Sequence, residues 1–411
     1  MLPNLKRLYN LMENHNLDAV IVLTPESIKY FGYEQWADAT RNWMLEPGGD
    51  SSNAYLNICI IPFGEKPLFI LNSFTLSFFN GNLKRVLPYG HFFKEITSDL
   101  KKIENKQSEK IIEKLKSGIF INQNEALTYL LKKLNLKNSR IAIECDGVNK
   151  KKLETIKSTL EKNKLFDGSE LLRLTRMIKT ADEINLLKKC FGLTESALID
   201  TIKIIKPKIT MGELIDYYKN YIESKGASYQ HLSLLALGQG MTESRDYSLN
   251  KNMIMGFDAG IILDKYISDT GLTVFWGSYK KSDLVMYDKL YDIVKYGFDA
   301  IKPGVNCSRV YHIMKSICEK NDLTNATFEG HGIGLSFREY PIINDKIKYK
   351  YFNGFNEVDA DFIIEENMII NLELGYHYLG EETYQIEKTV QVTKTGNKQI
   401  VSQNRKCPFL I

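Results

Sequence analysis

Five acidic and histidine residues in the second half of the chain have the types and spacing of a two-metal site. They are Asp258 in MGFDAG, Asp269 in YISDTG, His331 in GHGIG, Glu373 in INLELG and Glu387 in YQIEKT. Each lies in or beside an apolar segment, where an unpaired carboxylate would be costly to bury. Four neighbouring carboxylates would have to be protonated unless cations neutralise them. The pattern therefore predicts bound divalent ions and, with them, metal-dependent hydrolysis.

The types of the ligands limit the choice of metal. Four carboxylates with one imidazole suit Mn²⁺, Co²⁺, Fe²⁺ or Zn²⁺. Two such ions, about 3.5–4 Å apart, can activate a water molecule and polarise a carbonyl group. Any one of these residues alone is more often structural, and only the combination of five favours a metal site. We predict two divalent ions, with Mn²⁺ as the first choice.

The elements around these residues must bring them together. Asp258 and Asp269 are separated by a segment with room for a tight connection at residues 263–265, which predicts two adjacent antiparallel strands. Glu373 and Glu387 lie on two further apolar segments, joined by the turn-like sequence GYHYLGEET. The glycines that flank His331 would allow backbone and metal to approach closely.

The length of 411 residues predicts two domains rather than one. Apolar strand patterns at 17–24, 55–63, 66–72 and 139–147 alternate with helix patterns at 3–15, 121–136 and 149–163. This alternation predicts an α/β domain over residues 1–165 and a second domain over residues 166–411. Thr180 and Glu183 form a capping-box pattern that predicts the start of a long helix.

The composition gives little support for large or charged partners. The net charge of +4 is small beside 54 basic and 50 acidic residues, so we expect no nucleic-acid partner. The sequence offers no window of about 18 consecutive apolar residues, so we expect no membrane span. The six cysteines, at 59, 145, 190, 307, 318 and 407, form no C-x-x-C pair. Reduced thiols and a cytoplasmic location are expected.

The second half resembles the M24 metallopeptidase family, which has the pita-bread, or creatinase-like, fold. The resemblance rests on DAG at 258–260, SDTGLT at 268–273, HGIG at 331–334, ELG at 373–375 and IEKTVQVT at 386–393. LDAVIVLTPESIKYFGY resembles the start of a creatinase-type N-terminal domain. The resemblance implies an α+β pita-bread catalytic domain behind a smaller α/β domain, in the manner of aminopeptidase P and prolidase.

The resemblance also implies roles for the five residues. Asp258 and Asp269 would hold one metal, and His331, Glu373 and Glu387 would complete the other. Asp269 and Glu387 would bridge the two ions, and Glu373 would also act as the general base. By the same resemblance we expect a homodimer and a small peptide substrate of the Xaa-Pro type, cleaved at a C–N bond by a metal-bridging water.

The chain departs from the family pattern at positions that handle the substrate. Family peptidases have a second histidine seven residues after the metal histidine, where this chain has Arg338. Proline-specific members have an arginine at the position of Gln385, and Leu374 and Leu272 replace a family proline and arginine. Arg338 is predicted to bind an anionic group of the substrate or to assist catalysis, because guanidinium groups bind carboxylates bidentately.

Three other residues are weaker candidates. Arg245, Tyr384 and Gln385 are predicted to bind substrate. The segment before Asp258, GQGMTESRDYSLNKN, lacks the histidine found there in the family. His231 is a possible replacement, but its position in an apolar run favours core packing instead.

Three functions remain open. The first is a dinuclear metal hydrolase that cleaves a small peptide. The second is a non-peptidase of the same fold, such as a creatinase-like hydrolase or an enzyme like dimethylsulfoniopropionate lyase, which the replaced histidine positions favour. The third is a non-catalytic binding protein, against which the retention of all five ligand-type residues argues.

Overall fold

The structure, a computed structural model, describes residues 3–32, 57–73, 75–79, 81–90, 105–237, 241–242, 244–344, 350–352, 357–359, 361–400 and 407–411. The chain divides into two compact units. The first comprises Met1–Thr175 with Tyr351–Val358, and the second comprises Arg176–Lys350 with Asp359–Ile411. The predicted boundary at residue 165 therefore lies inside the first unit. The reason is that β6, Lys164–Asp167, pairs with β5, Arg140–Ile143, as an edge strand of the first unit's sheet.

The first unit is built on a six-stranded mixed sheet with the order β4-β3-β2-β1-β5-β6. The remaining strands are β1 Ala19–Val22, β2 Ile58–Pro62, β3 Leu68–Asn72 and β4 Val86–Tyr89. Its α-helices are α1 Leu5–Asn14, α2 Pro25–Tyr30, α4 Lys106–Lys116, α5 Gln123–Lys133, α6 Lys150–Thr159 and most of α7 Ser169–Met177. The predicted alternation of strands and helices is confirmed, although residues 55 and 56 of the second predicted strand lie outside the described residues.

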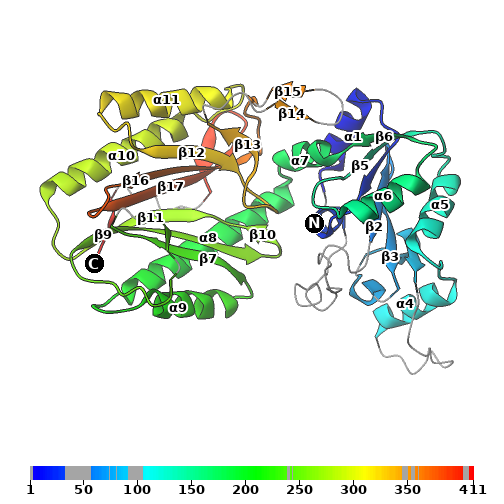
Figure 1. Cartoon of the computed structure of the whole chain (residues 1–411), viewed down its shortest axis with the longest axis horizontal. Helices are drawn as coiled ribbons and strands as arrows, with labels where there is room; N and C mark the ends of the chain where they lie inside the picture. The colour runs from blue at the N-terminus through cyan, green and yellow to red at the C-terminus, as the bar shows by residue number, and fades with distance from the viewer. Residues whose placement is uncertain are drawn as a thin grey trace. The chain divides into compact units, whose positions relative to one another are not determined.

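The second unit contains two sheets that pack against each other between two pairs of helices (Figure 1). The first sheet has the order β19-β11-β9-β7-β8, and the second has the order β13-β12-β16-β17-β18. The first sheet's strands are β7 Ser228–Leu235, β8 Met241–Thr242, β9 Met253–Leu263, β10 Tyr266–Ile267, β11 Thr270–Trp276 and β19 Phe409–Leu410. The second sheet's are β12 Thr327–Gly332, β13 Glu339–Ile343, β16 Ile369–His377, β17 Thr383–Val392 and β18 Asn397–Gln399. Lys350–Phe352 and Glu357–Asp359 form a separate two-stranded sheet, β14–β15, most of which belongs to the first unit.

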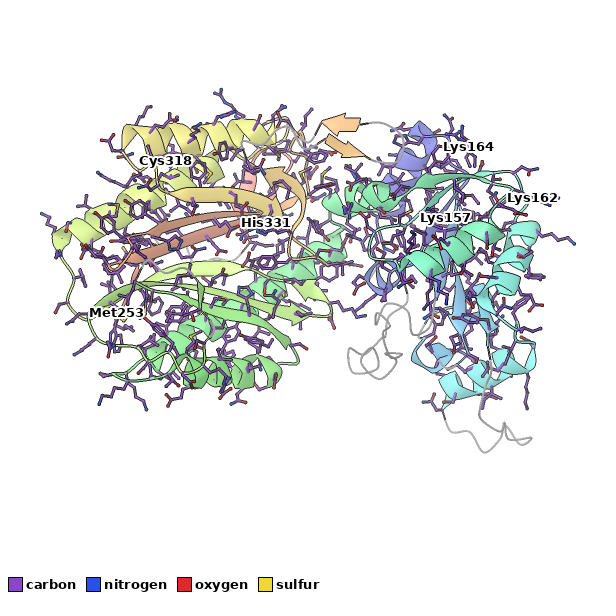
Figure 2. All side chains as sticks on the ribbon, viewed as in Figure 1. Lys157, Lys162, Lys164, Met253, Cys318 and His331 are labelled. Carbon is purple, nitrogen blue, oxygen red and sulfur yellow. The ribbon has the colours of Figure 1, made fainter. Side chains whose placement is uncertain are left out.

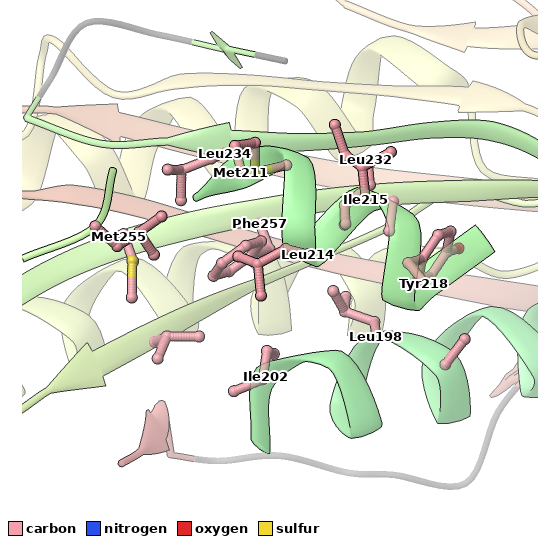
Figure 3. Packing of buried hydrophobic residues seen from close by; sticks show 14 of the residues in the cluster. Leu198, Ile202, Met211, Leu214, Ile215, Tyr218, Leu232, Leu234, Met255 and Phe257 are labelled. Carbon is pink, nitrogen blue, oxygen red and sulfur yellow. The ribbon is translucent and has the colours of Figure 1, made fainter. Parts of the chain in front are cut away.

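Helices α8 and α9 cover the outer face of the first sheet. They span Ala181–Lys203 and Met211–Glu223, and the predicted capping box of Thr180 and Glu183 opens α8. Leu198 and Ile202 of α8 pack with Leu214 and Tyr218 of α9 against strand residues such as Phe257, as Figure 3 shows. Alternate residues of β9 therefore face this apolar core, and those between them face the second sheet.

Helices α10, Lys281–Ala300, and α11, Cys307–Lys320, pack on the second sheet. Both sheets thus have one face covered by helices and the other turned toward the opposite sheet. All six cysteines are free thiols, as predicted. Among the described helices, none has a stretch long and apolar enough to cross a bilayer.

A hydroxyl group joins the two sheets next to the predicted ligands. Thr273 Oγ1 on β11 donates to the carbonyl oxygen of Gln385 at 2.8 Å and accepts from its N–H at 3.0 Å. The adjacent Gly271 leaves the space that Glu387 needs, because a Cβ there would lie 2.3 Å from Glu387 Oε1. The sheets are therefore aligned so that a carboxylate of β17 lies over a glycine of β11.

Three charged residues hold the segment that follows His331; Lys179 and Glu339 are buried, and Arg176 is partly buried. Lys179 Nζ lies 3.0 Å from Glu339 Oε2, and Arg176 Nε lies 3.3 Å from Oε1. Although burial alone would raise it, Lys179 and Arg176 hold the pKa of Glu339 below its ordinary value. Glu339 also accepts the backbone N–H of Ser336 and pairs with Gly332 across the β12–β13 ladder.

We predict that Lys179→Met destabilises the protein by about 3 kcal/mol or more, because it leaves most of the charge on Glu339 uncompensated in the interior. Urea unfolding followed by circular dichroism measures this loss. The double variant Lys179→Met/Glu339→Gln should recover much of it, since neither charge is then unpaired. A single variant as stable as the wild type would contradict the assignment.

Candidate metal centre

The first two predicted ligands lie on a hairpin. Asp258 is on β9 and lies opposite Gly271 of β11, and Asp269 comes directly before β11. The predicted tight connection is confirmed at Asp264 and Lys265, whose φ values of +47° and +71° are those of a type I′ turn. This hairpin places both carboxylates on the side of the first sheet that faces the second sheet.

The other three ligands lie on neighbouring strands of the second sheet. Glu373 of β16 is directly opposite Glu387 of β17 and Glu329 of β12, and His331 is opposite Asn371. Residues two apart on a strand share a face. The side chains that point from the second sheet toward the first are therefore those of Glu329, His331, Asn371, Glu373 and Glu387. His331, labelled in Figure 2, is fully buried between the two sheets.

The distances bring the two groups into one cluster. His331 Nε2 lies 3.6 Å from Asp269 Oδ2 and 3.7 Å from Glu373 Oε1. His331 Nδ1 lies 3.0 Å from the carbonyl oxygen of Gly332. Because a carbonyl oxygen can only accept, Nδ1 donates this hydrogen bond, and in the neutral ring Nε2 carries the lone pair. The structure thus joins all five predicted ligands in one place.

Two polar atoms in this cluster have no hydrogen-bond partner. They are Asp269 Oδ1 and His331 Nε2, and both are buried. Buried polar atoms are rarely left unsatisfied, and a metal ion would satisfy both. The residues therefore fit divalent ions, and the orphaned atoms are the observation that supports the fit.

Burial and mutual repulsion raise the pKa values of three carboxyl groups in this cluster. Burial raises the pKa of Asp269 well above its ordinary value, and the charges of Asp258 and Glu373 raise it further. Burial and the charges of Asp269 and Asp258 do the same to Glu387. Burial, only partly offset by His331, raises the pKa of Glu373 to about 7. Burial lowers the pKa of His331. All four pKa shifts favour the neutral form of the group. Bound divalent cations would allow the carboxyl groups to be charged.

Asn371 is a site residue that the sequence patterns did not identify. Its side-chain amide donates to Asp269 Oδ2 at 3.3 Å and to Glu387 Oε2 at 3.0 Å, and its Oδ1 accepts from Thr389 at 2.9 Å. It therefore orients one carboxylate from each sheet. Its spacing of two residues from Glu373 on the same strand is the signal that could have identified it.

His231 is the second residue whose position differs from expectation. Its side chain is not packed in the apolar core; Nε2 lies 2.7 Å from Asp258 Oδ1. The run HLSLL, from which core packing was predicted, does not have all its side chains on the apolar face of the sheet. Strand alternation turns Leu232 and Leu234 toward α8 and α9 and leaves His231 on the opposite face.

A cavity of about 640 Å³ opens beside the cluster. Asp258, Glu373, Arg338 and Gln385 are among the residues that line it. Arg338 is half exposed and forms ion pairs with Glu329 and, at 3.1 Å, with Glu373. Gln385 Nε2 donates to Glu387 Oε1 at 2.8 Å. Glu329, which the sequence patterns did not identify, is therefore the main partner of Arg338.

Two predicted substrate residues do not line this cavity. Arg245 forms an exposed ion pair with Asp216 of α9, at 2.6 Å. Tyr384 is buried and packs its ring against Phe275 and Tyr376. It points away from the site because it neighbours Gln385 on β17, and successive strand residues face opposite sides. For these two residues, the structure gives no support to a role in binding substrate.

Known proteins resemble the chain in sequence and in fold. The pattern of metallopeptidase family M24 matches residues 187–394. A Bacillus subtilis protein named "Putative dipeptidase YkvY" is 26% identical over 67% of this chain and 74% of its own length. Among solved structures, a dipeptidase from Pyrococcus horikoshii OT3 has a TM-score of 0.73 at 17% identity, covering 99% of this chain and 100% of that one. An Xaa-Pro dipeptidase from Bacillus anthracis has a TM-score of 0.71 at 16% identity, covering 99% of both chains. The two-domain pita-bread architecture predicted from the sequence is confirmed.

We predict that the metal-free protein loses stability as the pH rises from about 4.5 to about 7. The native state holds a proton on Glu373 that the unfolded chain has already released, so folding is favoured below the unfolded pKa and this contribution is lost through the folded pKa. Glu373 alone contributes up to about 3 kcal/mol over this range. Urea unfolding in EDTA at a series of pH values measures it.

The control for this experiment is Glu373→Gln, which should lessen the dependence of stability on pH and leave the part that the raised pKa values of Asp269 and Glu387 contribute. Added Mn²⁺ should stabilise the wild type most at the upper end of the range. If stability in EDTA were unchanged or rose between pH 4.5 and 7 in the wild type and the variant alike, Glu373 would not have the raised pKa that its burial implies.

Proposed function

Because the chain belongs to metallopeptidase family M24, we propose that it is a metal-dependent peptidase that hydrolyses a peptide bond of a small peptide. The observation that supports this most directly is the pair of orphaned buried atoms, Asp269 Oδ1 and His331 Nε2, within a cluster of four carboxylates. A cluster of this kind is costly to bury without cations and is of little use to a protein that only binds another protein.

The residues divide into two ligand groups about two shared carboxylates. Asp258 and Asp269 would hold one ion, and His331, Glu373 and Glu387 the other, with Asp269 and Glu387 reaching both. Bound divalent ions would lower the pKa of a water molecule and polarise the substrate carbonyl. Asn371 keeps Asp269 and Glu387 in the orientation that this requires, since it donates to both.

Glu373 is the proposed general base. It lines the cavity together with Asp258, whereas Asp269 and Glu387 are not among the residues that line it. A base must reach both the attacking water and the leaving amine, and a position at the cavity wall allows this. Arg338, 3.1 Å from Glu373, is placed to bind a substrate carboxylate at the same wall.

The cavity favours a short substrate. A volume of about 640 Å³ is within the range of small-molecule sites. Arg338 supplies one cation for a peptide carboxyl group, and Glu329 supplies an acceptor for an amino group. We propose a dipeptide, with Xaa-Pro dipeptides as the first class to test. Gln385 replaces the arginine typical of proline-specific relatives, so activity on other dipeptides is also expected.

The peptidase proposal is preferred to a creatinase-like or lyase-like reaction. Creatinase-like chemistry does not need metals, whereas this chain retains the full ligand set in one cluster. The Bacillus subtilis relative named as a dipeptidase supports the same choice. Mn²⁺, a homodimer and a cytoplasmic location stay predictions. Light scattering of the purified protein tests the dimer.

We predict that Glu373→Gln lowers kcat for dipeptide hydrolysis by roughly 10²–10⁴-fold, because an amide cannot accept the proton of the attacking water. The assay measures amino-acid release by metal-reloaded protein from Xaa-Pro dipeptides, other dipeptides and small zwitterionic amides. Glu381→Gln, at an exposed turn position, is the matched control and should retain full activity. The proposal fails if the wild type releases no amino acid from any dipeptide.

A further inference from the structure

We infer that His231 is a direct metal ligand of this protein, a sixth ligand that completes the Asp258–Asp269 half of the site with an imidazole. The inference rests on the proposed function, because it assumes that the cluster binds divalent ions. It adds a residue to the five that carry the family resemblance.

His231 lies close enough to Asp258 and Asp269 for the three residues to share one ion. His231 Nε2 lies 2.7 Å from Asp258 Oδ1 and 3.8 Å from Asp269 Oδ1. One ligand atom from each of these three residues lies within 4.8 Å of the other two. Ligand atoms about 2.0–2.2 Å from a shared ion lie about 2.8–3.6 Å apart at octahedral or tetrahedral angles. The three atoms therefore need only small adjustments to share one ion.

One carboxylate oxygen of Asp269 has no hydrogen-bond partner and lies on the side of His231. Asp269 Oδ1, the atom that faces His231 at 3.8 Å, has no hydrogen-bond partner and is buried. Its other oxygen, Oδ2, accepts from Asn371 and faces His331. The unsatisfied atom of the carboxylate thus points to the His231 side, where an ion between the two would satisfy it.

Gln230 lies against the other nitrogen of the His231 ring. His231 Nδ1 is in contact with Gln230 Oε1, an acceptor to which a protonated Nδ1 would donate. A neutral ring protonated at Nδ1 presents the lone pair of Nε2 to Asp258 and Asp269. A lone pair that faces two carboxylates is repelled by them unless a proton or a cation lies between. A neighbouring hydrogen bond that fixes the ring in this way is the usual support for a metal-bound histidine.

The backbone is arranged to bring the ring into this position. β7 has an irregularity between Tyr229 and His231, where the register against β9 shifts and Gln230 is the extra residue. A β-bulge of this kind re-aims the side chains that flank it. Across the ladder, Gly260 lies opposite His231, and a Cβ there would lie 2.7 Å from His231 Cε1. The absence of a side chain at residue 260 leaves the space that the imidazole occupies.

The added nitrogen has a consequence for the choice of metal. Asp258 and Asp269 alone offer only oxygen, which suits Mn²⁺ as well as any other ion. An imidazole increases the affinity for Co²⁺ and Zn²⁺ more than that for Mn²⁺. With His231 and His331, each half of the site has one nitrogen ligand. With His231 as a ligand we therefore expect tighter binding of Co²⁺ and Zn²⁺ than of Mn²⁺, so Mn²⁺, the first choice on the five other ligands alone, is no longer the metal expected.

The test counts metal-bound histidines directly. The chain has only six histidines, so protein labelled with ¹⁵N-histidine gives few ring signals. Titration of the metal-free protein with Zn²⁺ should move two ring nitrogens to metal-bound positions. His231→Gln should lose one of these signals and His331→Gln the other. His377→Gln, a control that removes another half-buried histidine of the cavity wall, should lose neither.

Metal competition gives a second readout. His231→Gln should weaken Zn²⁺ binding by at least about tenfold while changing Mn²⁺ binding much less, so the preference for Zn²⁺ falls. If the wild type binds Zn²⁺ through one histidine, and that signal is lost only in His331→Gln, the ligand role of His231 is overturned and the proposed function stands. If the wild type binds no divalent ion, both are overturned. The wild-type signal count holds even where a variant does not fold.

Discussion

Four carboxylates and two histidines face one another between two packed sheets, and much of the second unit is organised around the cost of placing them there. Burial raises the pKa values of Asp269, Glu373 and Glu387 because each charge is removed from water and lies near others of its own sign. The arrangement can be stable at neutral pH only if protons or cations offset that charge. Two orphaned atoms within it indicate cations.

The surrounding structure reduces this cost and fixes the geometry. Asn371 is the shared donor that holds a carboxylate from each sheet, and Thr273 sets the alignment of β11 with β17. Residues 260 and 271 are glycines, and the space that a side chain would need there is occupied by side chains from neighbouring strands. Lys179 and Glu339 hold the chain beyond His331 at the other side of the cluster. Each of these residues acts on the site by limiting where a ligand atom can move.

The substrate side of the site differs in character from the metal side. Arg338 and Glu329 are only partly buried, and Arg338 lies at the position that the family resemblance gives to a histidine. In the structure this guanidinium is paired with Glu329 and Glu373, so a substrate carboxylate would have to compete with these pairs. Competition of this kind favours substrates that bring both charges, as a zwitterionic dipeptide does.

The sequence by itself determined the ligand types, their order and the fold class. Asp258, Asp269, Glu373 and Glu387 could be proposed as ligands because each lies in or beside an apolar strand pattern that gives no other reason for its charge, and His331 because it lies in a glycine-rich loop. The hairpin turn at residues 264–265 and the capping box at Thr180 are local features, so short-range patterns were enough to predict them. Only the tertiary structure decided which side chains meet across the two sheets. His231 and Asn371 join the site through register, a bulge and the packing of one sheet on another, none of which a local pattern encodes. Tyr384 was misassigned for the same reason, since the face on which it lies depends on which side of β17 meets the first sheet.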